Sequence, residues 1–214
     1  RAAWLGKSFN PFETGGKLTS KDFQVPNLEL IKGISTSRLS DRRRLLARFD
    51  ASRRILDNRG FATAQDSFTE QAYRMVSTNS VRDAFDLKLE DRATRDLYGN
   101  SEFGQGMLLA RRLAERGVPF VTVGSGGWDN HGQKVCGFTL EQSLNKRGPH
   151  FDQVVAGLVT DLYRRGLDRQ ILLVCMGEFG RTPKVNSEAG RDHWGAVMTV
   201  LVSGGGLQVG QVIG

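Results

Sequence analysis

The chain has 214 residues, of which 39% are hydrophobic and 25% are charged, and its net charge is +7. This length and composition predict one globular domain with a hydrophobic core. The sequence contains no run of 18 or more apolar residues, so it predicts no membrane span. Two cysteines are too few for a disulfide framework, and no secretory signal segment is visible.

The first half of the chain predicts a loop-dominated lead-in followed by helices. Residues 1–39 are rich in Gly, Pro, Ser and Asn, with one short strand expected in VPNLEL. The part from 40 to 117 is mainly helical, with helices expected at 41–57, 65–76, 78–88 and 101–116. For the last helix, Asn100 or Ser101 is the expected N-cap, and Gly117 follows its end. Its apolar face carries Phe103, Met107, Ala110 and Ala114.

The expected helix at 41–57 is strongly basic, because six arginines lie within 42–54. Asp41, Asp50 and Asp57 offset part of this charge, so a solvated helix face is the expected role. No helix-turn-helix, zinc-finger spacing or RNA-binding aromatic signature accompanies the arginines, and no specific nucleic-acid binding is predicted. A basic surface can instead attract anionic substrates such as sulfated or phosphorylated polymers.

The part from 118 to 214 predicts a βαβ unit. Residues 118–124 and 170–176 are apolar and β-branched, as buried parallel strands are. An amphipathic helix between them begins near Phe151 and ends at Gly166, so a right-handed crossover should make the two strands parallel. A further strand is expected at 196–203. The three glycines after it predict a turn and not a nucleotide loop.

Three polar motifs follow these strands. They are GGWDNHG at 126–132, GEFGRTP at 177–183 and GRDHW at 190–194, and they contain two of the three histidines. The carboxyl ends of parallel strands lie at one rim of a sheet, where ligands bind. Oxygen and imidazole donors at that rim suit a divalent metal. The predicted ligands are Asp129, His131, Glu178, Asp192 and His193.

Each motif also has a simpler interpretation. Asp129 and His131 can be a hydrogen-bonded loop pair, and Glu178 can cap a helix or pair with Arg181. Asp192 and His193 can be an N-cap and a core histidine under Trp194. Ser125, beside the first motif, is expected to be a turn residue rather than a nucleophile. His150 is expected to have no metal role and to belong to a loop or to the first turn of the helix after Pro149.

These motifs resemble those of the bacterial family called domain of unknown function 1501 (DUF1501), often labelled sulfatase-like. The resemblance runs from WLGKSFNPFETGG at 4–16 through YGNSEFGQGMLLARRLAERGVPFVTVG at 98–124 to VLVSGGGLQVGQVIG at 200–214. It implies an α/β, alkaline phosphatase-like fold with a mostly parallel sheet flanked by helices. The whole chain, 1–214, would then be an incomplete, C-terminal-half portion of one such domain.

The resemblance also implies roles for the motif residues. WDNH would supply Asp129 and His131 to the metal, GEFGR would supply Glu178, and GRDHW would supply His193, with Asp192 as a further candidate. Phe179 stands where many members of the alkaline phosphatase and sulfatase superfamily have a histidine. This difference argues against the usual two-zinc arrangement. The nucleophile would lie in a preceding half, outside this chain.

The implied function is a metal-dependent hydrolase of sulfate or phosphate esters. Its cofactor would be Zn, Mn, Ca or Mg, and Arg181 or Arg191 would contact the anionic oxygens of a small or polymeric ester. Relatives often begin with a twin-arginine-type signal, which implies the periplasm or the cell surface. The alternative is a non-catalytic exported module that binds surface polymers or protein partners. The oligomeric state stays open.

Overall fold

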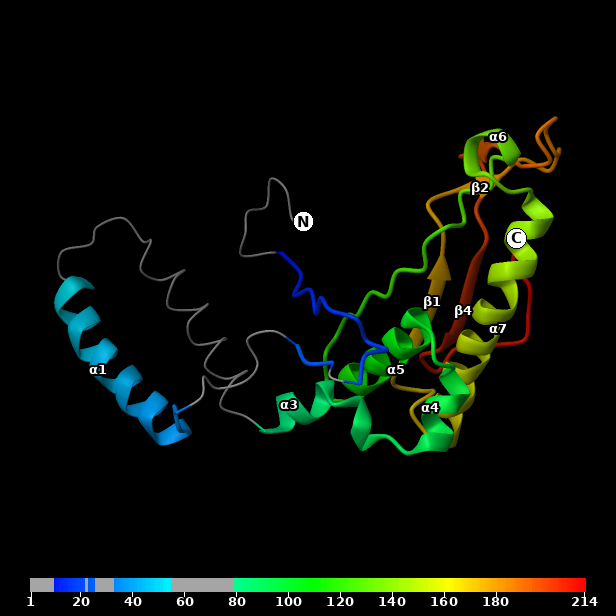
Figure 1. Cartoon of the computed structure of the whole chain (residues 1–214). Helices are drawn as coiled ribbons and strands as arrows, with labels where there is room; N and C mark the ends of the chain where they lie inside the picture. The colour runs from blue at the N-terminus through cyan, green and yellow to red at the C-terminus, as the bar shows by residue number, and fades with distance from the viewer. Residues whose placement is uncertain (1–9, 22, 26–32, 55–78) are drawn as a thin grey trace. The chain divides into compact units, whose positions relative to one another are not determined.

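The computed structural model describes residues 10–21, 23–25, 33–54 and 79–214, and the chain divides into two units, 1–86 and 87–214 (Figure 1). The described part of the first unit contains helices α1 (Thr36–Arg54) and α3 (Asn79–Phe85). The helix predicted at 41–57 is α1, which begins earlier, at Thr36. The helix predicted at 65–76 lies outside the described residues, as does nearly all of the strand expected in VPNLEL.

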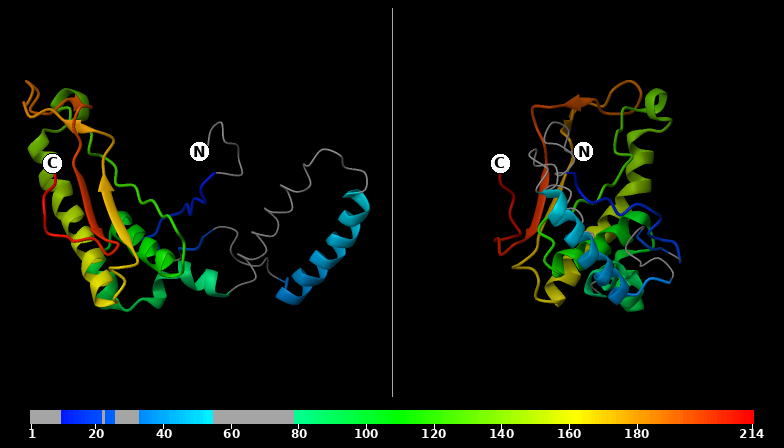
Figure 2. Two further views of the ribbon diagram at one scale, coloured as in Figure 1. Left: turned by 180° about the vertical axis from the view of Figure 1, so that it is seen from behind. Right: turned by 90° about the vertical axis from the view of Figure 1, so that its left-hand side faces the viewer.

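The second unit carries all of the predicted site residues. Its elements are η3 (Leu87–Leu89), α4 (Arg92–Tyr98), α5 (Glu102–Glu115), α6 (Gln133–Cys136), α7 (Leu140–Arg164), β1 (Leu172–Met176), β2 (Gly180–Arg181), β3 (His193–Trp194) and β4 (Val200–Gly204). Helices α4 and α5 pack against α7. Figure 2 shows α7 running alongside the strands β1 and β4. No helix among the described residues has the length and apolar character that crossing a membrane requires.

Helix α5 forms as its sequence predicts. Ser101 is its N-cap, with its hydroxyl accepting from the amide of Gly104 at 3.0 Å, and Gly117 follows the helix end with φ 85°. Buried apolar side chains of α5 and α7 form the core of this unit, with Leu108 and Val154 at 0% and 1% exposure. Burial of such side chains stabilises each by about 1.5–3 kcal/mol.

Helix α7 begins at Leu140, well before the predicted start near Phe151. Thr139 and Gln142 form a capping box, in which each side chain bonds the backbone amide of the other. This local capping sets the helix start, while the apolar stripe begins only later. Pro149 lies inside the helix, and His150 is an exposed residue of it rather than a residue of a loop or of its first turn.

A buried charge network joins Glu90, which follows η3, with the helices α4, α5 and α7. The Arg111 side chain is fully buried, and its Nη1 donates to Glu115 at 2.8 Å. Its Nη2 and Nε lie at ion-pair distances of 2.8 Å from Glu90 and 3.0 Å from Asp161. The hydroxyl of Tyr98, on α4, donates to Asp161 at 2.9 Å. Because each of these buried charges is paired, the ion pairs hold α5 and α7 in one fixed arrangement.

Both sheets of the described chain are two-stranded and antiparallel. β1 pairs with β4, in the register Val174 opposite Val202, and β2 pairs with β3. The strand expected at 118–124 does not form, so the expected parallel pairing with β1 is wrong. The segment leaves Phe120 85% exposed. A strand exists only where a partner edge accepts its backbone hydrogen bonds. β1 bonds β4 along one edge, and 118–124 pairs with no strand among the described residues. The architecture is therefore mixed helix and strand.

Candidate metal centre

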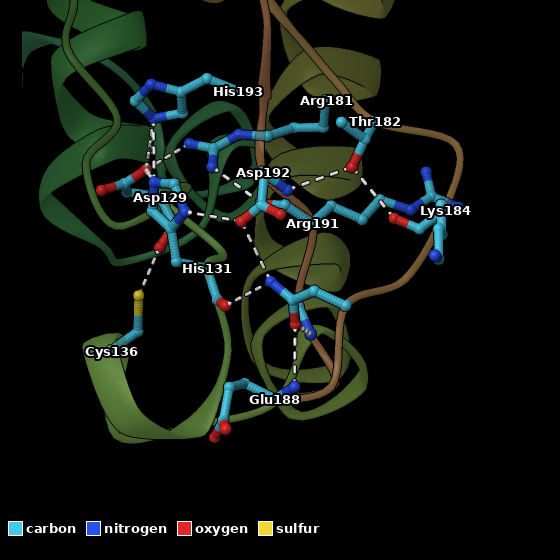
Figure 3. Close-up of polar contacts among 12 residues, drawn as sticks. Asp129, His131, Cys136, Arg181, Thr182, Lys184, Glu188, Arg191, Asp192 and His193 are labelled. Atoms are coloured by element: carbon cyan, nitrogen blue, oxygen red, sulfur yellow. Dashed lines mark hydrogen bonds and ion pairs between the residues drawn. The ribbon is translucent and has the colours of Figure 1, made fainter.

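The three polar motifs meet at one place on the second unit. Figure 3 shows the side chains of Asp129, His131 and His193 turned toward one another. The distances are 3.1 Å from His131 Nε2 to Asp129 Oδ1, 3.3 Å from His193 Nε2 to the same oxygen, and 2.9 Å between the two Nε2 atoms. These are the three described side chains that can hold one ion, and we call them the triad.

The backbone brings the motifs together through short bonds between loops. The amide of Arg191 donates to the carbonyl of Asn130 at 2.8 Å, and the amide of Gln133 donates to the carbonyl of Glu188 at 3.0 Å. A Cβ at Gly190 would collide with the backbone of His131, so this close approach requires glycine. On the other side, the β2–β3 ladder places Arg181 opposite His193. The loop of 129–133 therefore lies directly against 188–193.

Asn186 organises the loop between β2 and β3, and the sequence analysis did not single it out. Its Oδ1 accepts from the amides of Glu188 and Gly190, both at 3.0 Å. Its Nδ2 donates to the carbonyl of His131 at 3.0 Å and to Asp192 Oδ1 at 3.1 Å. The sequence does contain a signal for this role, because Asn186 lies between two glycine-containing motifs. Asparagine side chains in such loops often form hydrogen bonds with the backbone of their own loop.

The triad contains more lone pairs than protons. Two of its contacts have hydrogen-bond geometry, namely His193 Nε2 with Asp129 Oδ1 and the two Nε2 atoms with each other, whereas His131 Nε2 lies at ion-pair distance from Asp129 Oδ1. With the His131 proton on Nδ1, one proton on His193 Nε2 has two acceptors, which are Asp129 Oδ1 and the lone pair of His131 Nε2. Donors about 2.0–2.2 Å from a common ion have this mutual spacing, so the donor set fits a cation.

Asp192 lies behind His131 rather than in the triad. His131 Nδ1 is 3.4 Å from Asp192 Oδ1, a long hydrogen bond, which favours the tautomer with its proton on Nδ1. The Nε2 lone pair then faces Asp129 and His193. The hydrogen bond from Asn186, followed by that from His131, holds the pKa of Asp192 below its ordinary value. Asp192 is thus an anionic partner that orients the imidazole.

Arg181 also reaches the triad. Its Nη2 donates to Asp129 Oδ1, while its Nη1 donates to the carbonyl of Arg191 at 3.1 Å. The Arg181 hydrogen bond first, and that from His193 second, lower the pKa of the Asp129 carboxyl. Arg181 forms its ion pair with Asp129 and, among the described residues, none with Glu178. The simpler interpretation that Glu178 pairs with Arg181 is therefore wrong.

The other predicted residues lie outside this cluster. Glu178 is exposed and is not one of the three side chains that converge, so its role as a ligand stays a prediction. Asp192 caps no helix, and the His193 side chain is half exposed on β3 rather than in a core. The Ser125 hydroxyl accepts from Trp128 Nε1 at 3.1 Å, a local loop contact. The ring of Phe179 packs against His193, with centroids 4.3 Å apart.

The comparisons with known proteins identify a family and no individual relative. The family model described as "Protein of unknown function (DUF1501)" matches residues 1–214. Neither the curated proteins nor the solved structures contain a match.

Proposed function

The chain belongs to the DUF1501 family, and we propose that it is a metal-dependent hydrolase of sulfate or phosphate esters. The observation that carries this proposal is the triad, in which one carboxylate oxygen and two imidazole nitrogens converge within 2.9–3.3 Å. Three electron-pair donors at this mutual spacing match the ligands of one divalent cation.

In this proposal the triad holds one divalent ion. Two imidazoles and one carboxylate favour Zn or Mn over Ca or Mg, which prefer oxygen ligands alone. Three protein ligands leave positions for water or substrate, as in catalytic metal sites. The ion, when bound, would act as a Lewis acid on the ester oxygen and neutralise developing charge.

The chain's own residues prepare this site. Asp192 orients His131, Phe179 packs on His193, and the β2–β3 ladder holds Arg181 next to Asp129. Arg181 and Arg191 are the proposed contacts for the anionic oxygens, because a guanidinium binds such groups through two parallel N–H bonds. The sulfatase-like assignment, the alkaline phosphatase-like fold and export from the cytoplasm belong to the same proposal.

A specific observation favours a second candidate, a non-catalytic module that binds a partner. The face of the β1–β4 pair that carries Val174 is apolar and solvent-exposed. Its side chains are each 39–62% exposed, namely Leu172, Val174, Met176, Val200 and Val202. Apolar surface of this kind often marks an interaction site. In this alternative the triad holds a structural ion or none.

Metal content and turnover separate the two candidates. The full-length protein is purified and dialysed against Zn or Mn, its bound metal is measured by elemental analysis, and aryl sulfate and aryl phosphate esters are assayed. Bound metal with turnover of either ester supports the hydrolase. Bound metal without turnover on any ester removes the hydrolase for those substrates and leaves the module. Absence of bound metal contradicts the metal centre itself.

A further inference from the structure

Arg181 donates a hydrogen bond to the same oxygen of Asp129 that would bind an ion in the triad. Asp129 Oδ1 accepts from Arg181 Nη2 and is the same oxygen that faces His131 and His193. Resting on the proposed metal centre, we infer that Arg181 is an exchangeable partner of Asp129. A bound cation displaces Arg181 from Asp129, and the freed guanidinium then binds a phosphate or sulfate group. The ion would therefore switch on anion recognition.

The structure lets Arg181 change partner without leaving the site. Its backbone is held by the β2–β3 ladder, and its Nη1 is held separately by the carbonyl of Arg191 at 3.1 Å. The contact with Asp129 uses only Nη2. The Arg181 side chain is 23% exposed, whereas that of Asp129 is 65% exposed. Loss of the Asp129 contact would thus free one arm of the guanidinium while the other arm keeps it beside the triad.

The charges favour the exchange. Asp129 and Asp192 carry two negative charges in and beside the triad, which attract a cation, while Arg181 and Arg191 carry two positive charges. A divalent ion at the triad makes the sum of these charges positive, which attracts an anion. The ion also repels the guanidinium and competes for Asp129 Oδ1, so Arg181 needs a new acceptor. The planar guanidinium matches two oxygens of phosphate or sulfate.

This exchange predicts effects of opposite sign for one substitution. Arg181→Gln removes the competitor for Asp129, so Zn or Mn should bind more tightly, by about two- to fivefold, as expected for an exposed ion pair. The same variant should weaken inorganic phosphate binding to the metal-loaded protein by about 10- to 100-fold, because a charge-assisted hydrogen bond is lost. In the wild-type protein, phosphate should bind far more weakly before the metal is added.

Isothermal titration calorimetry measures both constants on the whole chain, first with the metal alone and then with inorganic phosphate. Arg181→Lys keeps the charge near Asp129 but loses the fork, so its metal affinity should stay close to wild type while phosphate binding weakens. His150→Ala, on the exposed side of α7, is the matched control and should change neither constant.

The outcomes distinguish the inference from the function on which it rests. A wild-type chain that binds no metal overturns both. The exchange is overturned, and the metal centre is left intact, if the wild-type chain binds metal but Arg181→Gln does not bind it more tightly. In that outcome Arg181→Gln also binds phosphate as well as the wild type does. If Arg181→Gln does not fold, as judged by circular dichroism, Arg181→Lys decides, because unchanged phosphate binding in that variant also overturns the exchange.

Discussion

The Nε2 atoms of His131 and His193 lie 2.9 Å apart, although the two residues belong to motifs separated by the whole of α7, β1 and β2. Two neutral imidazoles at this distance share at most one proton, so at least one lone pair faces the other ring. Asp129 Oδ1 completes the arrangement with contacts to both nitrogens. Three electron-pair donors that share so few protons have the mutual spacing expected of ligands around one cation.

Removal of any triad side chain should abolish most metal binding. Asp129→Ala, His131→Ala and His193→Ala are each expected to weaken the affinity for Zn or Mn by at least about 100-fold, because a site with three protein ligands depends on each of them. Calorimetric titration measures the loss, with His150→Ala as the control. Wild-type affinity in any of the three variants would contradict the assignment of that ligand.

Glu178→Ala tests one of the two predicted ligands that lie outside the triad. Glu178 is exposed and does not converge with Asp129, so the affinity of the three-ligand site should stay within about twofold of wild type. The same metal titration decides the point. A loss as large as that of His193→Ala would establish Glu178 as a fourth ligand.

Asp192 should act on the metal through His131. Asp192→Ala removes the acceptor behind Nδ1 and is expected to lower metal affinity by about 10- to 100-fold, the usual effect of losing such a partner. Asp192→Asn removes the charge but keeps an acceptor oxygen, and should recover part of that loss. Glu188→Gln is the matched control, because Glu188 pairs with Lys134 at 2.8 Å and not with the triad. If Asp192→Ala bound metal like the control, the positioning role would be wrong.

The buried network should make folding stability depend on acid. Burial opposes ionisation of Glu90, but hydrogen bonds and charges from Arg111 and Arg112 outweigh it and lower the pKa of Glu90 below 4.5. A lowered folded-state pKa stabilises the fold above the unfolded pKa, and this stabilisation disappears as the pH falls through the folded value. Urea denaturation should therefore show stability falling below about pH 4.5.

Glu90→Gln tests the source of that dependence. The substitution should cost about 3 kcal/mol at pH 7, because it leaves Arg111 and Arg112 short of a buried partner, and should flatten the stability profile between pH 3 and pH 5. A profile as steep as that of wild type would assign the acid dependence to other carboxyls.

Two glycines of α7 should respond in opposite directions to the same substitution. A Cβ at Gly157 would lie 2.6 Å from the carbonyl oxygen of Leu97, so Gly157→Ala should destabilise the α4–α7 contact by about 1–3 kcal/mol. Gly148 has open space around it, and Gly148→Ala should stabilise the helix by up to about 1 kcal/mol. Thermal denaturation of both variants measures the difference. A destabilised Gly148→Ala, or an unaffected Gly157→Ala, would contradict this packing.

The candidate metal ligands were predictable in part because their signal is local. Asp129, His131 and His193 stand in short glycine-flanked motifs, and the structure brings all three together. The roles of their neighbours were not predictable in this way. Asp192 was expected as a ligand and lies behind His131, while Arg181 pairs with Asp129 across 52 positions of sequence. Which carboxylate faces an ion depends on side-chain directions that spacing does not specify.

The sequence by itself determined the features that depend on a few adjacent residues. The sequence limited the N-cap of α5 to Asn100 or Ser101, of which the structure has Ser101, and it predicted the turn after β4. Both follow from local backbone preferences and capping bonds. Only the tertiary structure decided which segment pairs with β1. Residues 118–124 and β4 both have strand-forming sequences, but backbone hydrogen bonds are alike for every residue, and the choice of partner depends on packing between distant segments.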